Sequence, residues 1–144
     1  KSTRLVSKVL GGEYPDYEQI LPQKSLHEIT VHRDELASLL RQIALFTSES
    51  NQSVKFVFEN NVLQLFATTS DIGEGVVSMP VNYSGPSFRI AFNPWYLLDI
   101  IRHITQDTLT LRLNDTLNPG VIDDGGKNIY LLMPMRLSEE INKE

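Results

Sequence analysis

The sequence predicts an α+β fold in which two amphipathic helices pack on an antiparallel sheet. Two segments, 36–44 and 97–104, carry apolar residues at the spacing of one helix face. Short runs with the alternation typical of β-strands surround both segments. The order of one strand, one helix and three strands occurs twice, about 60 residues apart, which indicates an internal duplication.

The first repeat is predicted from residue 26 onward. Residues 26–32 alternate between apolar and polar side chains, and Asp34 and Glu35 favour the positive end of the helix that follows. The turn Glu59-Asn60-Asn61 is typical of a β-hairpin, because asparagine tolerates a positive φ. The three strands after the helix are predicted at 54–58, 62–67 and 72–79.

The second repeat has the same order. Residues 87–92 form its predicted first strand. Asn93 followed by Pro94 is typical of a helix N-cap with proline at the first helical position. The three strands after this helix are predicted at 108–113, 120–123 and 128–133.

The ends of the chain differ from this repeated pattern. Residues 5–10 are strand-like and end at Gly11-Gly12, and Pro15 and Pro22 then discourage regular structure. The chain is therefore expected to be a piece of a larger protein. It divides into a tail and linker at 1–24, a domain at 25–137 and a polar C-terminal extension at 138–144.

Composition excludes several classes of protein. The 144 residues are 41% hydrophobic, which suffices for a core, and they include no cysteine. A disulfide framework and a thiolate site are thereby excluded, and a cytosolic origin is permitted. No apolar run approaches the roughly 20 residues of a membrane span. The net charge of −5 argues against tight binding to nucleic acid through phosphate contacts alone.

Few side chains indicate catalysis. His27, His32 and His103 lack the spacing of a metal site, and no metal or cofactor is expected. Asp99 and His103 stand four residues apart on a predicted helix and could form a base oriented by a carboxylate. A small α+β hydrolase-like enzyme using this pair is one alternative, although Arg102 within reach of Asp99 favours a solvated helix face.

Two apolar features suggest a partner. Leu45 falls opposite Leu36 on a helical wheel of about 100° per residue, and Phe46 follows it. Both either turn into the core or form a patch for another protein. Residues 131–137 keep large hydrophobic side chains beyond Pro134, and flexible methionines suit a surface that accepts varied apolar ligands. A stand-alone peptide-binding module is therefore a second alternative.

Four segments carry a family resemblance: LVSKVLGGEYPDY with ILP in 5–22, VNYSG with Phe88 and IAFNPWYLLDII in 81–101, LTLRLNDTLNPGVI in 109–122 and IYLLMPMRL in 129–137. They resemble the C-terminal part of the bacterial β sliding clamp, the non-catalytic processivity (beta) subunit of DNA polymerase III. The resemblance implies the DNA-clamp fold, with three duplicated domains per subunit. It also implies a cytoplasmic protein whose subunits dimerise head to tail into a ring around duplex DNA. Residues 1–24 would then end the second domain, and 25–137 would be the third.

The resemblance implies three surfaces. The helices would face DNA and carry Arg33, Arg41, Arg102 and His103. The subunit interface would include Leu45, Phe46, Ile72 and Glu74. A hydrophobic cleft would bind short glutamine-led motifs of polymerase subunits, the clamp loader and repair proteins. Its walls would be Pro15, Ile20, Asn93, Tyr96, Leu117, Pro119, Leu131, Leu132, Met133, Pro134, Met135 and Arg136.

Overall fold

The computed structural model describes residues 2–21 and 24–137, so the predicted extension at 138–144 lies outside the described residues. The first repeat comprises β1 (His27–His32), α2 (Arg33–Ala44), β2 (Val54–Glu59), β3 (Val62–Thr69) and β4 (Gly73–Pro80). The second comprises β5 (Phe88–Phe92), α3 (Pro94–His103), β6 (Thr108–Leu113), β7 (Gly120–Asp123) and β8 (Ile129–Leu132). The duplicated order of one strand, one helix and three strands is therefore confirmed.

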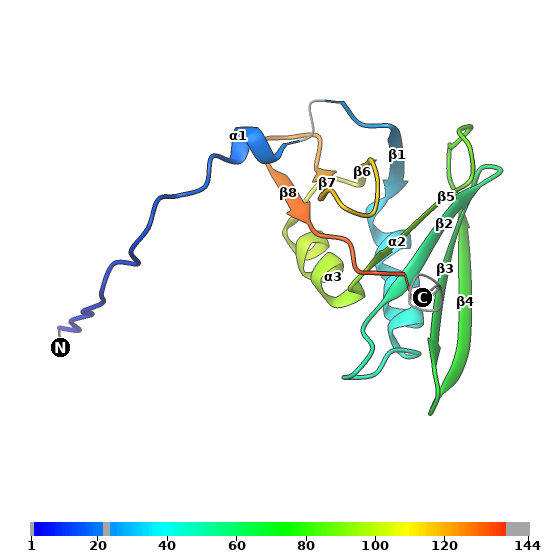
Figure 1. The fold of residues 1–144 in the computed structure, drawn as a ribbon, viewed down its shortest axis with the longest axis horizontal. Helices are drawn as coiled ribbons and strands as arrows, with labels where there is room; N and C mark the ends of the chain where they lie inside the picture. Colours follow the sequence, from blue (N-terminus) through cyan, green and yellow to red (C-terminus); the bar gives the residue numbers. More distant parts are fainter. Residues whose placement is uncertain (1, 22–23, 138–144) are drawn as a thin grey trace, which may run out of the picture.

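The strands form two antiparallel sheets instead of the single sheet predicted (Figure 1). One sheet has the order β1-β6-β7-β8 and the other has the order β4-β3-β2-β5. Each sheet thus contains three strands of one repeat and the first strand of the other repeat. Apolar alternation tells which face of a strand is buried, but it does not tell which strand lies beside it.

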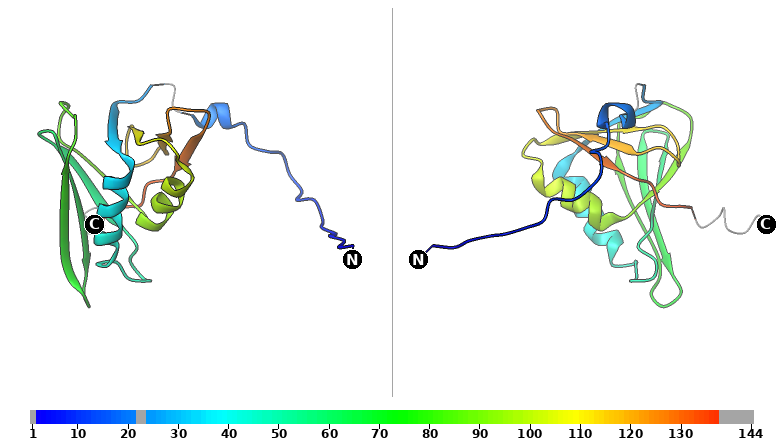
Figure 2. Two further views of the ribbon diagram at one scale, coloured as in Figure 1. Left: turned by 180° about the vertical axis from the view of Figure 1, so that it is seen from behind. Right: turned by 60° about the vertical axis from the view of Figure 1, so that its left-hand side comes forward.

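The two long helices pack against each other, and α2 also contacts β1, β3 and β4. Figure 2 shows the β4-β3-β2-β5 sheet on the side of α2 away from α3. The predicted apolar stripes are mostly buried, with Leu39 and Ile100 only partly so, and both sheets contribute to the same core. One hydrophobic core therefore unites the two repeats.

Local signals in the sequence place the turns and helix ends correctly. Asn60 and Asn61 have φ angles of 51° and 59° at the β2–β3 turn. Asn93 is the N-cap of α3 and accepts a 2.9 Å hydrogen bond from the backbone N–H of Trp95, with Pro94 between them. Both features match the predicted hairpin and N-cap.

Residues 2–21, the part of the N-terminal segment that the structure describes, contain no strand, so the strand-like prediction for 5–10 is wrong. Leu5 and Leu10 are 92% and 93% exposed, and a strand is stable only when a neighbouring strand pairs with it. A single helical turn, α1 (Tyr17–Ile20), follows, with Asp16 accepting a hydrogen bond from the N–H of Glu18. The segment before α1 runs away from the domain (Figures 1 and 2).

Candidate functional site

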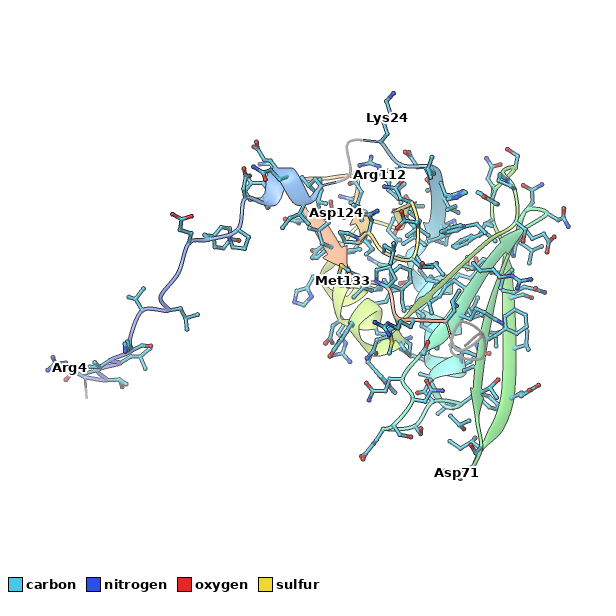
Figure 3. All side chains as sticks on the ribbon, in the orientation of Figure 1. Arg4, Lys24, Asp71, Arg112, Asp124 and Met133 are labelled. Carbon is cyan, nitrogen blue, oxygen red and sulfur yellow. The ribbon has the colours of Figure 1, made fainter. Side chains whose placement is uncertain are left out.

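The segment that leaves β8 presents apolar side chains at the surface (Figure 3, where Met133 is labelled). Leu131 and Met133 are 38% and 58% exposed, whereas Leu132 between them is buried, because successive side chains of a strand point to opposite faces. Met135 donates its backbone N–H to the carbonyl oxygen of Ala91 in β5 across 2.7 Å. The segment therefore crosses from one sheet to the other, and Leu132 supports it from beneath. The next residues are half-buried or exposed: Pro134, Met135 and Arg136.

The start of α3 adjoins this segment, since Met135 bonds to Ala91 two residues before the N-cap of α3, and α3 also contacts β8. Tyr96 in the first turn is 61% exposed. Asn93 is buried, and besides capping the helix it donates from Nδ2 to Oε1 of Gln52 at 2.9 Å. Asn93 thus holds the start of α3 in place, while its own polar atoms are already paired. Gln52 was not predicted, because nothing in sequence marks a residue 41 positions away as its partner.

The connection between β6 and β7 contributes a third element. Leu117 is 82% exposed. The carboxylate of Asp115 accepts 2.8 Å hydrogen bonds from the backbone N–H groups of Leu117 and the next residue, and these bonds hold the pKa of Asp115 below its usual value. Pro119 is followed by Gly120, which pairs with Leu132 of β8. The loop therefore ends beside the segment after β8.

The exposed side chains on these neighbouring elements are named the cleft surface below: Tyr96, Leu117, Leu131 and Met133 with their immediate neighbours. The remaining predicted cleft residues lie in or next to α1. Ile20 is 44% exposed, Pro15 is exposed, and none of the residues of α1 is buried. The predicted cleft residues in and next to α1 are thus exposed, like Tyr96, Leu117 and Met133 of the domain.

The face formed by α2 and α3 carries the arginines predicted to face DNA. Nε of Arg33 lies 2.8 Å from Oδ1 of Asp34, and its Nη1 donates to the carbonyl of Ile104 at 3.1 Å. The Arg33 guanidinium lowers the pKa of the Asp34 carboxyl. A hollow of about 390 Å³ lies between the helices, and it is lined in part by Arg33, Asp34, Arg41, Trp95 and Arg102.

Trp95 was missed by the sequence analysis, although it is 47% exposed in this hollow. Its position directly before Tyr96 on a helix places the two rings about 100° apart around the axis. An aromatic residue beside the apolar stripe is a signal that could have identified it.

The pair considered for catalysis does not form a dyad. Nδ1 of His103 lies 2.8 Å from the backbone carbonyl oxygen of Asp99, not from its carboxylate. The carboxylate of Asp99 instead pairs with Arg102 at 3.3 Å. All three side chains are exposed on α3, so the hydrolase-like alternative lacks an oriented base and is wrong. The described residues hold no group of three or more acidic, histidine or cysteine side chains that could bind a metal ion.

A second apolar patch lies at the end of α2 and on the edge strand β4. Sequence left open whether Leu45 and Phe46 are buried or exposed, and the structure separates them. Leu45 is 71% exposed, whereas Phe46 is half-buried with its ring packed on Gly75. The exposed apolar members of this patch are Leu45, Ile72 and Val76, and Glu74 is exposed beside them on β4.

Comparison with known proteins identifies the architecture. A family model described as the DNA polymerase III beta subunit, C-terminal domain, matches residues 18–136. The chain belongs to this family. The beta sliding clamp of Chlamydia muridarum is 45% identical to the chain over 139 residues, which are 96% of this chain and 38% of that protein. The clamp of Synechocystis is 33% identical, with 93% and 35% covered.

Solved clamp structures share the fold of this beta-subunit domain. The beta subunit of Thermotoga maritima has a TM-score of 0.82 at 32% identity and covers 88% of this chain, which spans 35% of that one. The clamp of Bartonella birtlesii bound to griselimycin has a TM-score of 0.82 at 27% identity, with 89% and 35% covered. The chain therefore spans a little over a third of the length of these clamps, and the resemblance to the clamp family is confirmed. Among the described residues, no helix has the length and apolar character needed to cross a membrane.

Proposed function

We propose that this chain supplies the third domain of a ring-shaped sliding clamp, a non-catalytic cytoplasmic factor that tethers a DNA polymerase to duplex DNA. The family match over 18–136, within a chain a little over a third as long as the clamps, is the observation that carries this proposal. In the whole protein, residues 1–24 complete the second domain and the linker, 25–137 form the third domain, and 138–144 extend it.

The duplication supports assembly at both ends of the domain. The exposed apolar patch on β4 belongs to the last strand of the first repeat, and β8 is the last strand of the second repeat. Both are edge strands of their sheets. An unpaired edge is a template for pairing with another strand. In the proposed ring, β4 with Leu45, Ile72 and Glu74 meets the second subunit, and the β8 end meets the preceding domain.

The cleft surface supports docking of peptide motifs from polymerase subunits, the clamp loader and repair proteins. Leu117, Leu131 and Met133 provide exposed aliphatic area, while Tyr96 adds a ring with a polar tip. Such a combination suits a short segment that carries leucine and phenylalanine behind an orienting amide. Pro15 and Ile20 close the cleft only when the preceding domain places α1 over it, so this chain alone binds weakly.

A calorimetric titration of the chain tests the cleft. The probe is a synthetic peptide with a glutamine followed by leucine and phenylalanine. Tyr96→Ala and Met133→Ala are each expected to weaken binding at least fivefold, because both side chains are exposed on the cleft surface. Trp95→Ala is the matched control, since it removes a neighbouring exposed aromatic residue that lines the hollow between the helices. Equal affinities of all four proteins would refute the site.

A further inference from the structure

The first repeat contains a groove at the position that corresponds to the cleft surface of the second repeat. The groove has a volume of about 410 Å³. It is formed by the end of β1, the start of α2, the β2–β3 turn and the end of β4. The cleft surface is formed by the start of α3, the β6–β7 connection and the end of β8. The two sites therefore use equivalent elements of the duplicated fold.

Individual residues also occupy equivalent positions in the two repeats. His32 and Glu35 line the groove and are the N-cap of α2 and the third residue of its first turn. Asn93 and Tyr96 hold the same two positions in α3. The floor of the groove is apolar, since Val31, Met79 and Val81 are buried beneath it, and its rim is exposed and polar: Thr30, His32, Glu35, Asn61 and Asn82.

The two repeats differ in what covers the first strand. In the second repeat, Met135 bonds to the carbonyl of Ala91, two residues before the N-cap of α3. The equivalent residue of the first repeat is Thr30, two residues before the N-cap of α2. In the first repeat, the chain after β4 bonds to the β2–β3 turn instead of to β1, because Val81 donates its N–H to the carbonyl of Asn61 at 2.9 Å. Within the described residues, the outer edge of β1 carries no strand.

We propose that this groove is a second peptide-docking site, in which an extended segment of a partner protein lies along the free edge of β1. A strand edge selects an extended chain, whose N–H groups bond to main-chain carbonyls, here that of Thr30. An aliphatic side chain of the ligand covers the apolar floor. Among the described side chains that line the groove, Glu35 is the one carboxylate, so a lysine or arginine follows the aliphatic residue.

The preference for a cation distinguishes this groove from the cleft surface, where Arg136 is exposed instead. The choice of a peptide as ligand rests on the function proposed for the cleft surface. Binding to the groove is nevertheless measured at different residues from binding to the cleft surface. The two proposals can therefore fail independently.

The test is a titration of the isotope-labelled 144-residue chain, monitored by amide chemical shifts. The probe is the peptide Ser-Leu-Val-Lys-Ser with blocked ends, and its control carries glutamate in place of lysine. The lysine peptide is expected to shift the amides of Thr30, His32, Glu35 and Asn82 saturably and to bind at least fivefold more tightly than the glutamate peptide. Glu35→Lys is expected to reverse this preference, and its exposed position on α2 leaves the fold intact.

Other outcomes overturn the proposal. Absence of saturable shifts at the groove, or equal affinities of both peptides for both proteins, would exclude a peptide site there. Shifts confined to Tyr96, Leu131 and Met133 would exclude the groove and leave the cleft surface in place. Conversely, a glutamine-led peptide that leaves Tyr96 and Leu131 unperturbed removes the proposed cleft, whatever the lysine peptide does at Thr30.

Discussion

The ring of Phe46 lies directly on the backbone of Gly75, so that a Cβ atom added at Gly75 would overlap Cδ2 of Phe46. This contact joins the end of α2 to the edge strand β4, the two elements of the proposed subunit interface. Gly75→Ala is expected to destabilise the domain by about 1–3 kcal/mol, because the ring must move out of a packed position. Urea unfolding measures the effect.

Two controls accompany this substitution. Gly11→Ala places a methyl group where nothing lies within 4 Å, and it is expected to change stability by less than about 0.5 kcal/mol. Phe46→Ala combined with Gly75→Ala should lose less than the sum of the single changes. Full additivity of the two changes would contradict the contact.

Asn93→Ala is expected to destabilise the domain by about 1–2 kcal/mol, because Asn93 caps α3 through the N–H of Trp95 and also bonds to Gln52. Asn93→Asp keeps the cap and loses only the donor to Gln52, so its loss should be smaller. Thermal unfolding of both variants measures the difference, and a more stable alanine variant would be inconsistent with this role.

His27 is expected to make stability depend on pH. Its ring stacks on Phe88 with centroids 4.0 Å apart, and Nδ1 lies 2.7 Å from Oη of Tyr83. Because Oη of Tyr83 donates to the carbonyl of Pro86 at 2.6 Å, Nδ1 of His27 is the donor in the other bond. Burial lowers the pKa of His27 from its ordinary value of 6.5.

The lowered pKa of His27 makes the folded domain less stable at low pH. The unfolded chain binds a proton at His27 more readily than the folded domain does, so stability is full above pH 6.5 and falls as pH drops through 6.5 towards the lowered pKa. Urea unfolding between pH 8 and pH 5.5 measures the slope. His27→Gln should flatten it, and an unchanged slope would show that another group causes the dependence.

This chain is expected to bind duplex DNA weakly, with a dissociation constant above about 10⁻⁶ M at physiological salt. The arginines on the helix face are offset by Asp34 and Asp99, and the chain carries a net charge of −5. Arg41→Glu should weaken binding further and reduce its salt dependence. A dissociation constant well below this limit, measured by fluorescence anisotropy, would mean that the isolated domain binds duplex DNA tightly without the rest of a ring.

In a full-length protein that carries this domain, Leu45→Lys is expected to shift the proposed ring towards single subunits. Leu45 is 71% exposed here, so the folding stability of the isolated chain should change by less than about 0.5 kcal/mol. Sedimentation of the full-length variant and urea unfolding of the chain separate the two effects. A stable dimer with an unstable domain would place Leu45 in the fold instead of the interface.

Much of the fold was predictable because local signals decide it. Asn93 with Pro94 marked the start of α3, and Asn60 with Asn61 marked the β2–β3 turn. The exposed positions of Tyr96 and Met133 also agree with a surface role. The contact of Asn93 with Gln52 and the bond from Met135 to Ala91 could not be predicted, because they join residues about 40 positions apart. The strand expected at 5–10 failed because strand formation depends on a partner strand.

The exchange of first strands between the repeats has a consequence for how such a domain could arise. If the chain were cut between β4 and β5, the first strand of each half would have its pairing partner in the other half. Neither half could then complete a sheet and a core by itself. A single ancestral half could therefore have folded in water only as a dimer of two identical chains, in which the first strand of each chain pairs in the sheet of the other. Fusion of the two chains into one polypeptide would have made this dimer permanent.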